Sequence, residues 1–128
     1  MTDAEEIRVR KRRERLGRRS EMFATWLLRL KGYRILGRRV RTPLGEIDLI
    51  ARAPSGMLCF VEVKMRSAAE TALLALGPQQ QMRIARAAEL YLAHRPELGR
   101  KGVRFDVITV GASAWPRHLP DAWRPDWR

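Results

Sequence analysis

The sequence predicts an α/β domain in which helices flank a mixed sheet, in the order helix, three strands, helix, strand. Three observations predict it. An apolar stripe at helical spacing runs over residues 16–30, and three short strand-like segments separated by tight turns lie between residues 33 and 65. A second helical stripe, opening at Pro78, precedes an apolar strand at 103–110. A chain of 128 residues is expected to form one domain.

The first helix is expected to begin at Leu16, and residues 1–15 are interpreted as a basic extension ahead of a domain that spans 16–128. The extension includes Arg12 and Arg13 within a run of basic residues. A solvated, frayed helix start and an arm that binds a nucleic-acid backbone explain this run equally well. Gly32 is expected to end the helix.

The next three segments are expected to form an antiparallel meander. They span 33–41, 46–51 and 57–65, and the turns at 42–45 and 53–56 contain Pro and Gly. The third segment is apolar on both faces at its start, which is typical of a central strand covered on both sides.

The second half of the chain is expected to cross over and return to the sheet. A helix over 78–94 ends before Pro96, and the strand at 103–110 should run parallel to the third strand through a right-handed crossover. Residues 66–77 are ambiguous, with a loop containing a helical turn as the expectation. The tail, with Trp123 and Trp127 among prolines, is expected to pack as a lid or short helix.

The charge balance favours a polyanionic partner. Lys and Arg total 26 against 14 for Asp and Glu, a formal charge of +12, which points to nucleic acid more than to a membrane surface. No apolar run approaches the roughly 20 residues of a membrane span, and the N-terminal charges do not fit a signal peptide. The lone Cys59 fits a reducing cytoplasm, and one Cys with two His disfavours a zinc site.

Charged residues interrupt the two strands that should lie at the centre of the sheet. Glu62 and Lys64 share one face of the third strand, and Asp48 stands among apolar residues of the second. Burying a charge costs several kcal/mol unless it is paired or bound to a metal. Because the two strands are adjacent, we expect Asp48 and Glu62 to converge.

Two converging carboxylates favour a divalent cation, Mg²⁺ or Mn²⁺, because their repulsion is removed by the ion. A lysine beside such a cation can hold or deprotonate a water, which is the arrangement of metal-assisted phosphodiester hydrolysis. An ordinary Glu62–Lys64 ion pair with a solvated Asp48 explains the spacing about as well.

The strand motifs resemble the PD-(D/E)xK nuclease superfamily, and the wider frame resembles its YraN family of bacterial proteins. The resemblance rests on Gly45-Glu46-Ile47-Asp48-Leu49-Ile50-Ala51, Phe60-Val61-Glu62-Val63-Lys64, Arg104-Phe105-Asp106-Val107 and His118-Leu119-Pro120-Asp121-Ala122-Trp123. It spans about residues 17–123. It implies a restriction-endonuclease-like core, and the order of site residues is also similar to that of archaeal Holliday-junction resolvases.

The resemblance also implies roles for individual residues. Asp48 and Glu62 become metal ligands, with the Val63 carbonyl as a further one. Glu21 reaches the metal directly or through water, and Lys64 orients the attacking water or stabilises developing charge.

The chain departs from the family pattern at two positions. Gln80 aligns where the family usually has a Lys, and it would help to hold the metal-bound water. Arg39 replaces an Asn in the first strand.

A positive rim is expected around the acidic pocket, to bring a phosphate backbone close to two carboxylates. Its predicted members are Arg34, Arg39, Arg41, Arg66, Arg12 and Arg13. Asp106, beside Arg104, is expected to form a structural ion pair, and Trp123 and Trp127 are expected to be packing residues.

Three hypotheses for function follow. The first is a Mg²⁺- or Mn²⁺-dependent endonuclease acting on DNA more than RNA, on branched structures and with little sequence specificity. The second is a non-catalytic nucleic-acid-binding protein of the same fold. The third is an adaptor whose tryptophan-rich tail docks a protein partner. Resemblance to resolvases adds a homodimer as an alternative to a monomer, because two symmetric cuts need two sites.

Overall fold

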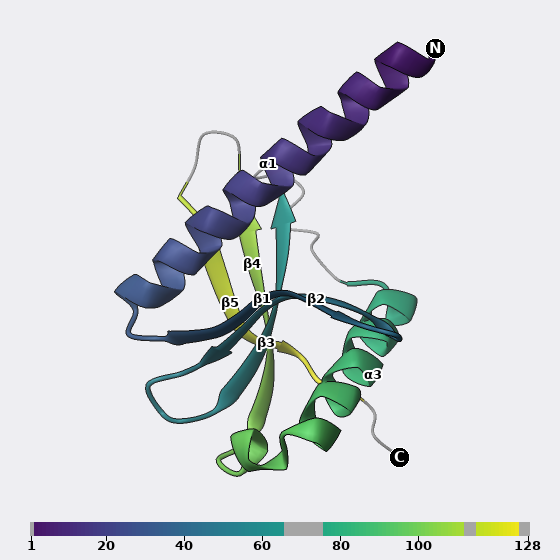
Figure 1. The fold of residues 1–128 in the computed structure, drawn as a ribbon. Coiled ribbons are helices and arrows are strands. Elements are labelled where there is room, and N and C mark those ends of the chain that lie inside the picture. The colour runs from purple at the N-terminus through teal and green to yellow at the C-terminus, as the bar shows by residue number, and fades with distance from the viewer. Residues whose placement is uncertain (1, 66–75, 112–114, 126–128) are drawn as a thin grey trace.

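The computed structural model describes residues 2–65, 76–111 and 115–125, and it contains a five-stranded mixed sheet with a helix on each face (Figure 1). The sheet order is β1-β2-β3-β4-β5. The strands are β1 (Arg34–Thr42), β2 (Gly45–Arg52), β3 (Leu58–Met65), β4 (Val103–Val110) and β5 (Arg117–Trp123). The helices are α1 (Asp3–Leu30), α3 (Pro78–His94) and the 3-10 turn η1 (Pro96–Gly99). The predicted mixed α/β fold is confirmed.

The strand pairing follows the predicted topology. β1, β2 and β3 form an antiparallel meander, and β3 pairs with β4 in parallel after the crossover through α3. β3 is therefore the central strand, as its two apolar faces predicted. Gly32, with φ 86°, supplies the left-handed turn that ends α1, as expected.

The helix α1 begins at Asp3, well before the Leu16 start that the apolar stripe predicted. Thr2 and Glu5 form a capping box, in which each side chain accepts a hydrogen bond from the other residue's backbone N–H. Asp3, Glu5 and Glu6 then place negative charge in the first turn, where the helix dipole favours it. The predicted stripe is also corrected. Of its apolar residues, Phe23 and Leu30 are exposed, and the buried face of α1 instead contains Ser20, Ala24 and Leu28 at successive turns.

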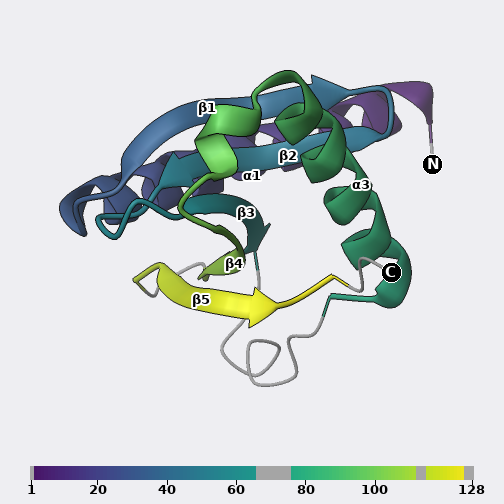
Figure 2. The same cartoon turned by 90° about the horizontal axis from the view of Figure 1, so that it is seen from below.

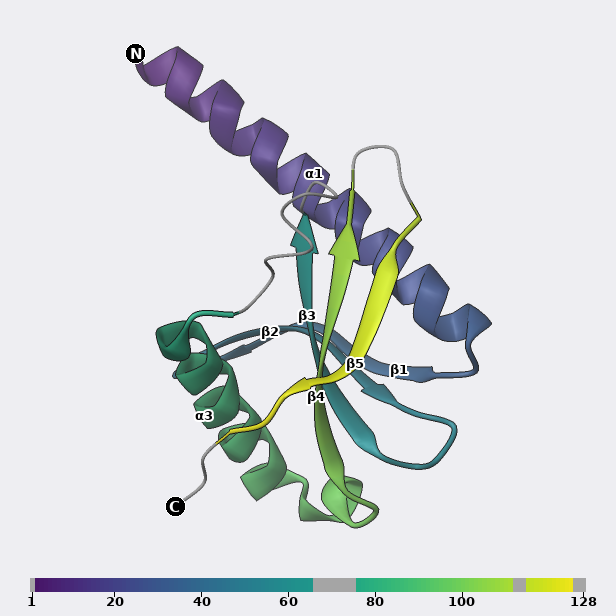
Figure 3. The ribbon, with the colours of Figure 1, turned by 180° about the vertical axis from the view of Figure 1, so that it is seen from behind.

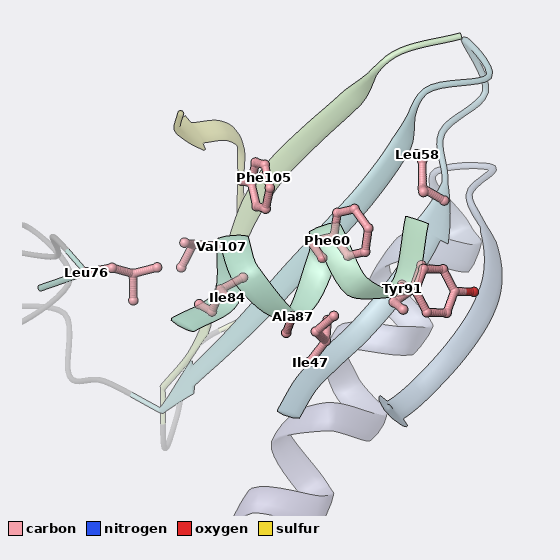
Figure 4. Close-up of a cluster of buried hydrophobic side chains, with 11 residues drawn as sticks. Ile47, Leu58, Phe60, Leu76, Ile84, Ala87, Tyr91, Phe105 and Val107 are labelled. Carbon is pink, nitrogen blue, oxygen red and sulfur yellow. The ribbon is translucent and has the colours of Figure 1, made fainter. Parts of the chain in front are cut away.

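Each face of the sheet has its own core. Under α1, Ala24 and Leu28 pack against Leu49, Cys59 and Val61. Under α3, the side chains shown in Figure 4 fill the space between the helix and the sheet; they include Ile47, Phe60, Ile84, Ala87, Tyr91 and Phe105. Figure 2 shows α1 and α3 from below, with the sheet between them. Among the described residues, no helix is long and apolar enough to cross a membrane.

The tail corrects the prediction of a lid or short helix, because residues 117–123 form the edge strand β5, antiparallel to β4. Trp123 packs its ring 4.4 Å from that of Phe105, centroid to centroid, which confirms its packing role. An edge strand tolerates Pro120, since one side of the strand needs no hydrogen-bond partner. Trp127 and the ambiguous segment over 66–75 lie outside the described residues.

Candidate active site at the end of β3

The site begins where the β2–β3 ladder stops. The paired residues run from Arg52 opposite Leu58 to Leu49 opposite Val61 and go no further. Beyond that point the Val63 N–H donates instead to Asp48 Oδ2, at 2.8 Å. Ile47 and Ile50 both belong to the α3-side core and Leu49 to the α1-side core, so strict alternation fails beside Asp48. The strand therefore turns here, and Asp48 reaches sideways toward β3.

Glu62 and Lys64 occupy the adjoining end of β3, on the same face, as predicted. Lys64 Nζ lies 3.3 Å from Glu62 Oε1, and the two side chains are only 18% and 12% exposed. Gln80, in the first turn of α3, donates from Nε2 to the same Glu62 oxygen at 3.0 Å. One carboxylate thus receives two donors from two different elements.

The two carboxyl groups do not ionise independently. Burial raises the pKa of Asp48 to about 7, and the nearby Glu62 carboxylate and a hydrogen bond between the two carboxyls contribute to the rise. Burial also raises the pKa of Glu62, although Lys64, Asp48 and Gln80 counteract it. Without a cation, the raised pKa values of both groups therefore oppose ionisation of the two carboxyls together.

Glu21 approaches this pair from α1, but its carboxylate is engaged. Arg39 Nε donates to Glu21 Oε2 in a short ion pair. Arg39 lies between the pairs Arg38–Leu49 and Val40–Ile47, opposite Asp48, and has a left-handed φ of 50°. The negative charge of Glu21 still contributes to the raised pKa of Asp48. The sequence pattern did not indicate this ion pair, which joins residues 18 positions apart.

The donor set fits a hard divalent cation. Asp48 and Glu62 supply oxygen ligands whose mutual repulsion a cation would remove. The Val63 carbonyl faces the same gap between β2 and β3 as its N–H does, because both groups of a strand residue point to one edge. No group of three or more His, Cys, Asp or Glu side chains in the described part of the chain is positioned to hold a metal. A cation here would therefore complete its shell with carbonyl and water oxygens, unless Glu21 leaves Arg39.

The predicted rim is only partly assembled. Arg41 is exposed on the β1–β2 hairpin, with its Nε 3.7 Å from Glu46 Oε2, at the same end of the sheet as the site. Arg34 is a correction: it pairs with Arg52 at the other end of β1, because the register carries it away from Asp48. Arg66 lies outside the described residues, as do the side chains of Arg12 and Arg13.

A second polar cluster lies between β4 and β5, away from the site. Asp106 is fully buried and accepts two hydrogen bonds from Arg104, one from His118 Nε2 at 2.7 Å and one from the Asp121 N–H. The expected ion pair of Asp106 with Arg104 is confirmed. The partner His118 was not predicted, because it arrives from β5.

The fold and the site define an α/β protein with a restriction-endonuclease-like core and a carboxylate pair at the end of its central strand. The model of the Uncharacterised protein family UPF0102 matches residues 20–110, and the chain belongs to that family. UPF0102 is the YraN family, so the predicted membership is confirmed.

Two curated relatives illustrate the match. A UPF0102 protein of Parvibaculum lavamentivorans is 50% identical over 111 residues, which cover 87% of this chain and 83% of the relative. One from Paramagnetospirillum magneticum is 44% identical over 130 residues, covering 98% of this chain and all of the relative.

Proposed function

We propose that the protein is a metal-dependent endonuclease that hydrolyses phosphodiester bonds in DNA with little sequence specificity. The observation that carries the proposal is the half-buried Asp48–Glu62 pair beside Lys64. Two half-buried carboxyls, one of which has its pKa raised to about 7, lower the stability of the fold at neutral pH, and this cost favours a functional over a purely structural role.

Each residue of the site has its own role in the proposed reaction. Asp48, Glu62 and the Val63 carbonyl would hold Mg²⁺ or Mn²⁺, which when bound polarises the phosphate and acidifies a water. Lys64 would position that water or offset the charge that develops on the phosphate. Gln80 fixes the orientation of Glu62 through its hydrogen bond and has a second amide hydrogen for the water.

The net positive charge of the chain supports nucleic acid as the substrate class. A net charge of +12 draws the chain to a polyanion, and phosphate contacts by arginines such as Arg41 and Arg39 carry little sequence information. Branched DNA is the preferred substrate in this proposal, acted on in the cytoplasm, where the buried Cys59 stays a thiol. A homodimer would supply the second cut on such a substrate.

The test is metal titration of the wild type against Asp48→Asn, with cleavage of a panel of linear, flapped and four-way DNA. We expect cleavage by the wild type in Mg²⁺ or Mn²⁺ and none by the variant, whose DNA binding in EDTA is unchanged or tighter. Asn keeps the shape of Asp and can accept the Val63 hydrogen bond, so loss of folding does not explain the loss of cleavage. Absence of wild-type cleavage in both metals contradicts the proposal.

One observation favours the second candidate, a nucleic-acid-binding protein without catalysis. Glu21, the third acidic residue, is neutralised by Arg39 instead of facing Asp48 and Glu62 without a partner. In that case DNA or RNA binds in EDTA, no metal supports cleavage, and Asp48→Asn changes neither property.

A further inference from the structure

The N-terminal part of α1 projects beyond the sheet. Figures 1 and 3 show this segment extending past all five strands. Among the side chains of this region that the structure describes, Ser20 is the first buried one, and those of residues 2–11, 18 and 19 are exposed. We call residues 3–19 the basic arm. At 1.5 Å per residue it is roughly 25 Å long.

The arm is helical although all of its described side chains are exposed. Its start is fixed by the Thr2–Glu5 capping box. Residues 8–19 nevertheless contain eight basic residues, seven of them arginine, and Glu14 is the one acidic residue among them. Like charges three and four residues apart destabilise an isolated helix, so the arm gains stability when a polyanion neutralises it.

The pattern of the arm excludes a bilayer surface as its natural partner. A helix that lies on a membrane needs a continuous apolar face. Ile7 lies about 160° from Val9 around the helix, because each residue advances it by roughly 100°. Val9 and Leu16 fall on one side, but Arg12 and Arg13 stand between them at helical spacing. The arm therefore lacks an apolar stripe.

The charges also lie on opposite sides of the helix. Arg10 and Arg19 are nine positions apart, about half a turn around the axis, and both are exposed. A flat surface would meet only one of them. A groove lined by phosphates on both walls meets both at once, and arginine suits phosphate because its guanidinium can donate two hydrogen bonds.

The arm leads directly away from the candidate site. Its helix carries Glu21, which is close enough to Asp48 to contribute to the raised pKa of that residue. The family model begins at residue 20, so the arm lies outside the part of the chain that it matches. Nucleic acid held by the arm would thus extend from the site along about 25 Å, roughly seven or eight base pairs at 3.4 Å each.

We propose that the basic arm lies in the major groove of a B-form DNA duplex that flanks the cleavage site. The inference rests on the proposed function and narrows its substrate to DNA with a duplex arm of about eight base pairs. The B-form major groove, about 12 Å wide, admits a helix. The major groove of duplex RNA is too narrow, so the arm discriminates between the two.

The test compares two adjacent Arg-Lys pairs that carry the same charge. Arg10→Gln/Lys11→Gln neutralises part of the arm, and Arg100→Gln/Lys101→Gln is the matched control. The control pair is exposed and precedes β4, whose first residue pairs with Leu58 at the end of β3 remote from Glu62. Gln keeps helix propensity, so the arm variant retains its helix, which circular dichroism checks.

Binding is measured in EDTA by fluorescence anisotropy over a range of salt, on a 20-base-pair DNA duplex. We expect the arm variant to lower the slope of log affinity against log salt by about 2, since roughly 0.9 is lost per phosphate contact. The control pair should leave the slope as in the wild type. Equal slopes for arm variant and control overturn the proposal.

Two further probes test the groove. DNA with glucosylated hydroxymethylcytosine has a filled major groove and unchanged phosphates. It should bind the wild type about tenfold more weakly, with little change for the arm variant. Duplex RNA of the same sequence should show no difference between arm variant and control. Equal wild-type affinity for filled and open grooves overturns the proposal, as does phosphatidylserine-vesicle binding that is lost in the arm variant.

The readouts separate this inference from the nuclease proposal. Binding in EDTA involves no catalysis, and cleavage in Mg²⁺ is scored on its own. A protein that shows the arm effects and cuts nothing contradicts only the nuclease proposal. One that cuts DNA without the arm effects contradicts only the inference.

Discussion

Asp106 and Asp48 are two aspartates on strands that flank β3, and their surroundings have opposite effects. Asp106 receives donors from Arg104, His118 and the Asp121 backbone. Burial would raise its pKa, but these hydrogen bonds outweigh burial and hold the pKa below its usual value. Asp48 has one backbone donor and faces another carboxyl, and its pKa rises to about 7.

The difference distinguishes a structural anchor, the Asp106 cluster, from a candidate functional site, the Asp48–Glu62 pair. The Asp106 cluster ties β4 to β5 and, through Tyr33 and the Lys31–His118 contact, to the end of α1. Its charge is satisfied by the protein alone, so it needs no ligand. The Asp48 pair is satisfied only in part, and a cation would complete it. A buried or half-buried charge therefore indicates a functional site where the protein supplies too few hydrogen-bond donors to stabilise it.

The largest expected effect is on the anchor. Asp106→Ala should lower the free energy of unfolding by about 3–5 kcal/mol, because it leaves Arg104 and His118 without their buried partner. Denaturant unfolding measures the loss. Arg124→Ala is the control, since it removes an exposed ion pair with Asp121 and should leave stability nearly unchanged. An Asp106→Ala protein as stable as this control would remove the distinction between anchor and site.

The second prediction concerns pH. Asp48 binds its proton more tightly in the folded state, so folding takes up protons between pH 4 and 7 and stability falls as pH rises through this window. Asp48→Asn removes the titrating group. Without metal, the free energy of unfolding of the variant relative to the wild type should rise by about 1–3 kcal/mol between pH 5 and pH 8. If the stability difference between variant and wild type does not change with pH, then the protein stabilises the Asp48 carboxylate as fully as it stabilises that of Asp106.

The sequence predicted the parts of both regions that depend on local pattern. Alternation along 57–65 placed Glu62 and Lys64 on one face, and two apolar faces identified the central strand. The spacing of Arg104 and Asp106 indicated their ion pair. The start of α1 is also encoded locally, since Thr2 and Glu5 have capping-box spacing, although the arginine run that follows disfavours an isolated helix.

The remaining features depend on tertiary contacts that no local pattern encodes. Glu21 meets Arg39 across 18 positions, and Lys31 meets His118 across 87. The turn of β2 at Asp48 follows from the end of a ladder. Proline-rich composition concealed β5, because prolines disfavour strands everywhere except at an edge.

The third prediction compares the half-buried Lys64–Glu62 ion pair with an exposed one. Lys64→Met should lower stability by about 1–2 kcal/mol at pH 8, because Glu62 loses its counter-charge in a half-buried position. At pH 5 the loss should shrink, since the raised pKa of Glu62 lets it take up a proton instead. Arg41→Met, which breaks the exposed pair with Glu46, should show no measurable change at either pH.

The smallest expected effect tests whether Glu21 can join the site. Arg39→Asn releases Glu21 and also suits the left-handed backbone at φ 50°, which Asn tolerates better than Arg. A free Glu21 carboxylate adds an oxygen ligand near Asp48, so the Mg²⁺ concentration for half-maximal cleavage should fall a few-fold at saturating DNA. Arg39→Gln releases Glu21 without the backbone benefit, so it should shift the metal requirement equally while being less stable than Arg39→Asn. If neither variant shifts the metal requirement, Glu21 is no ligand, and the site works with two carboxylates alone.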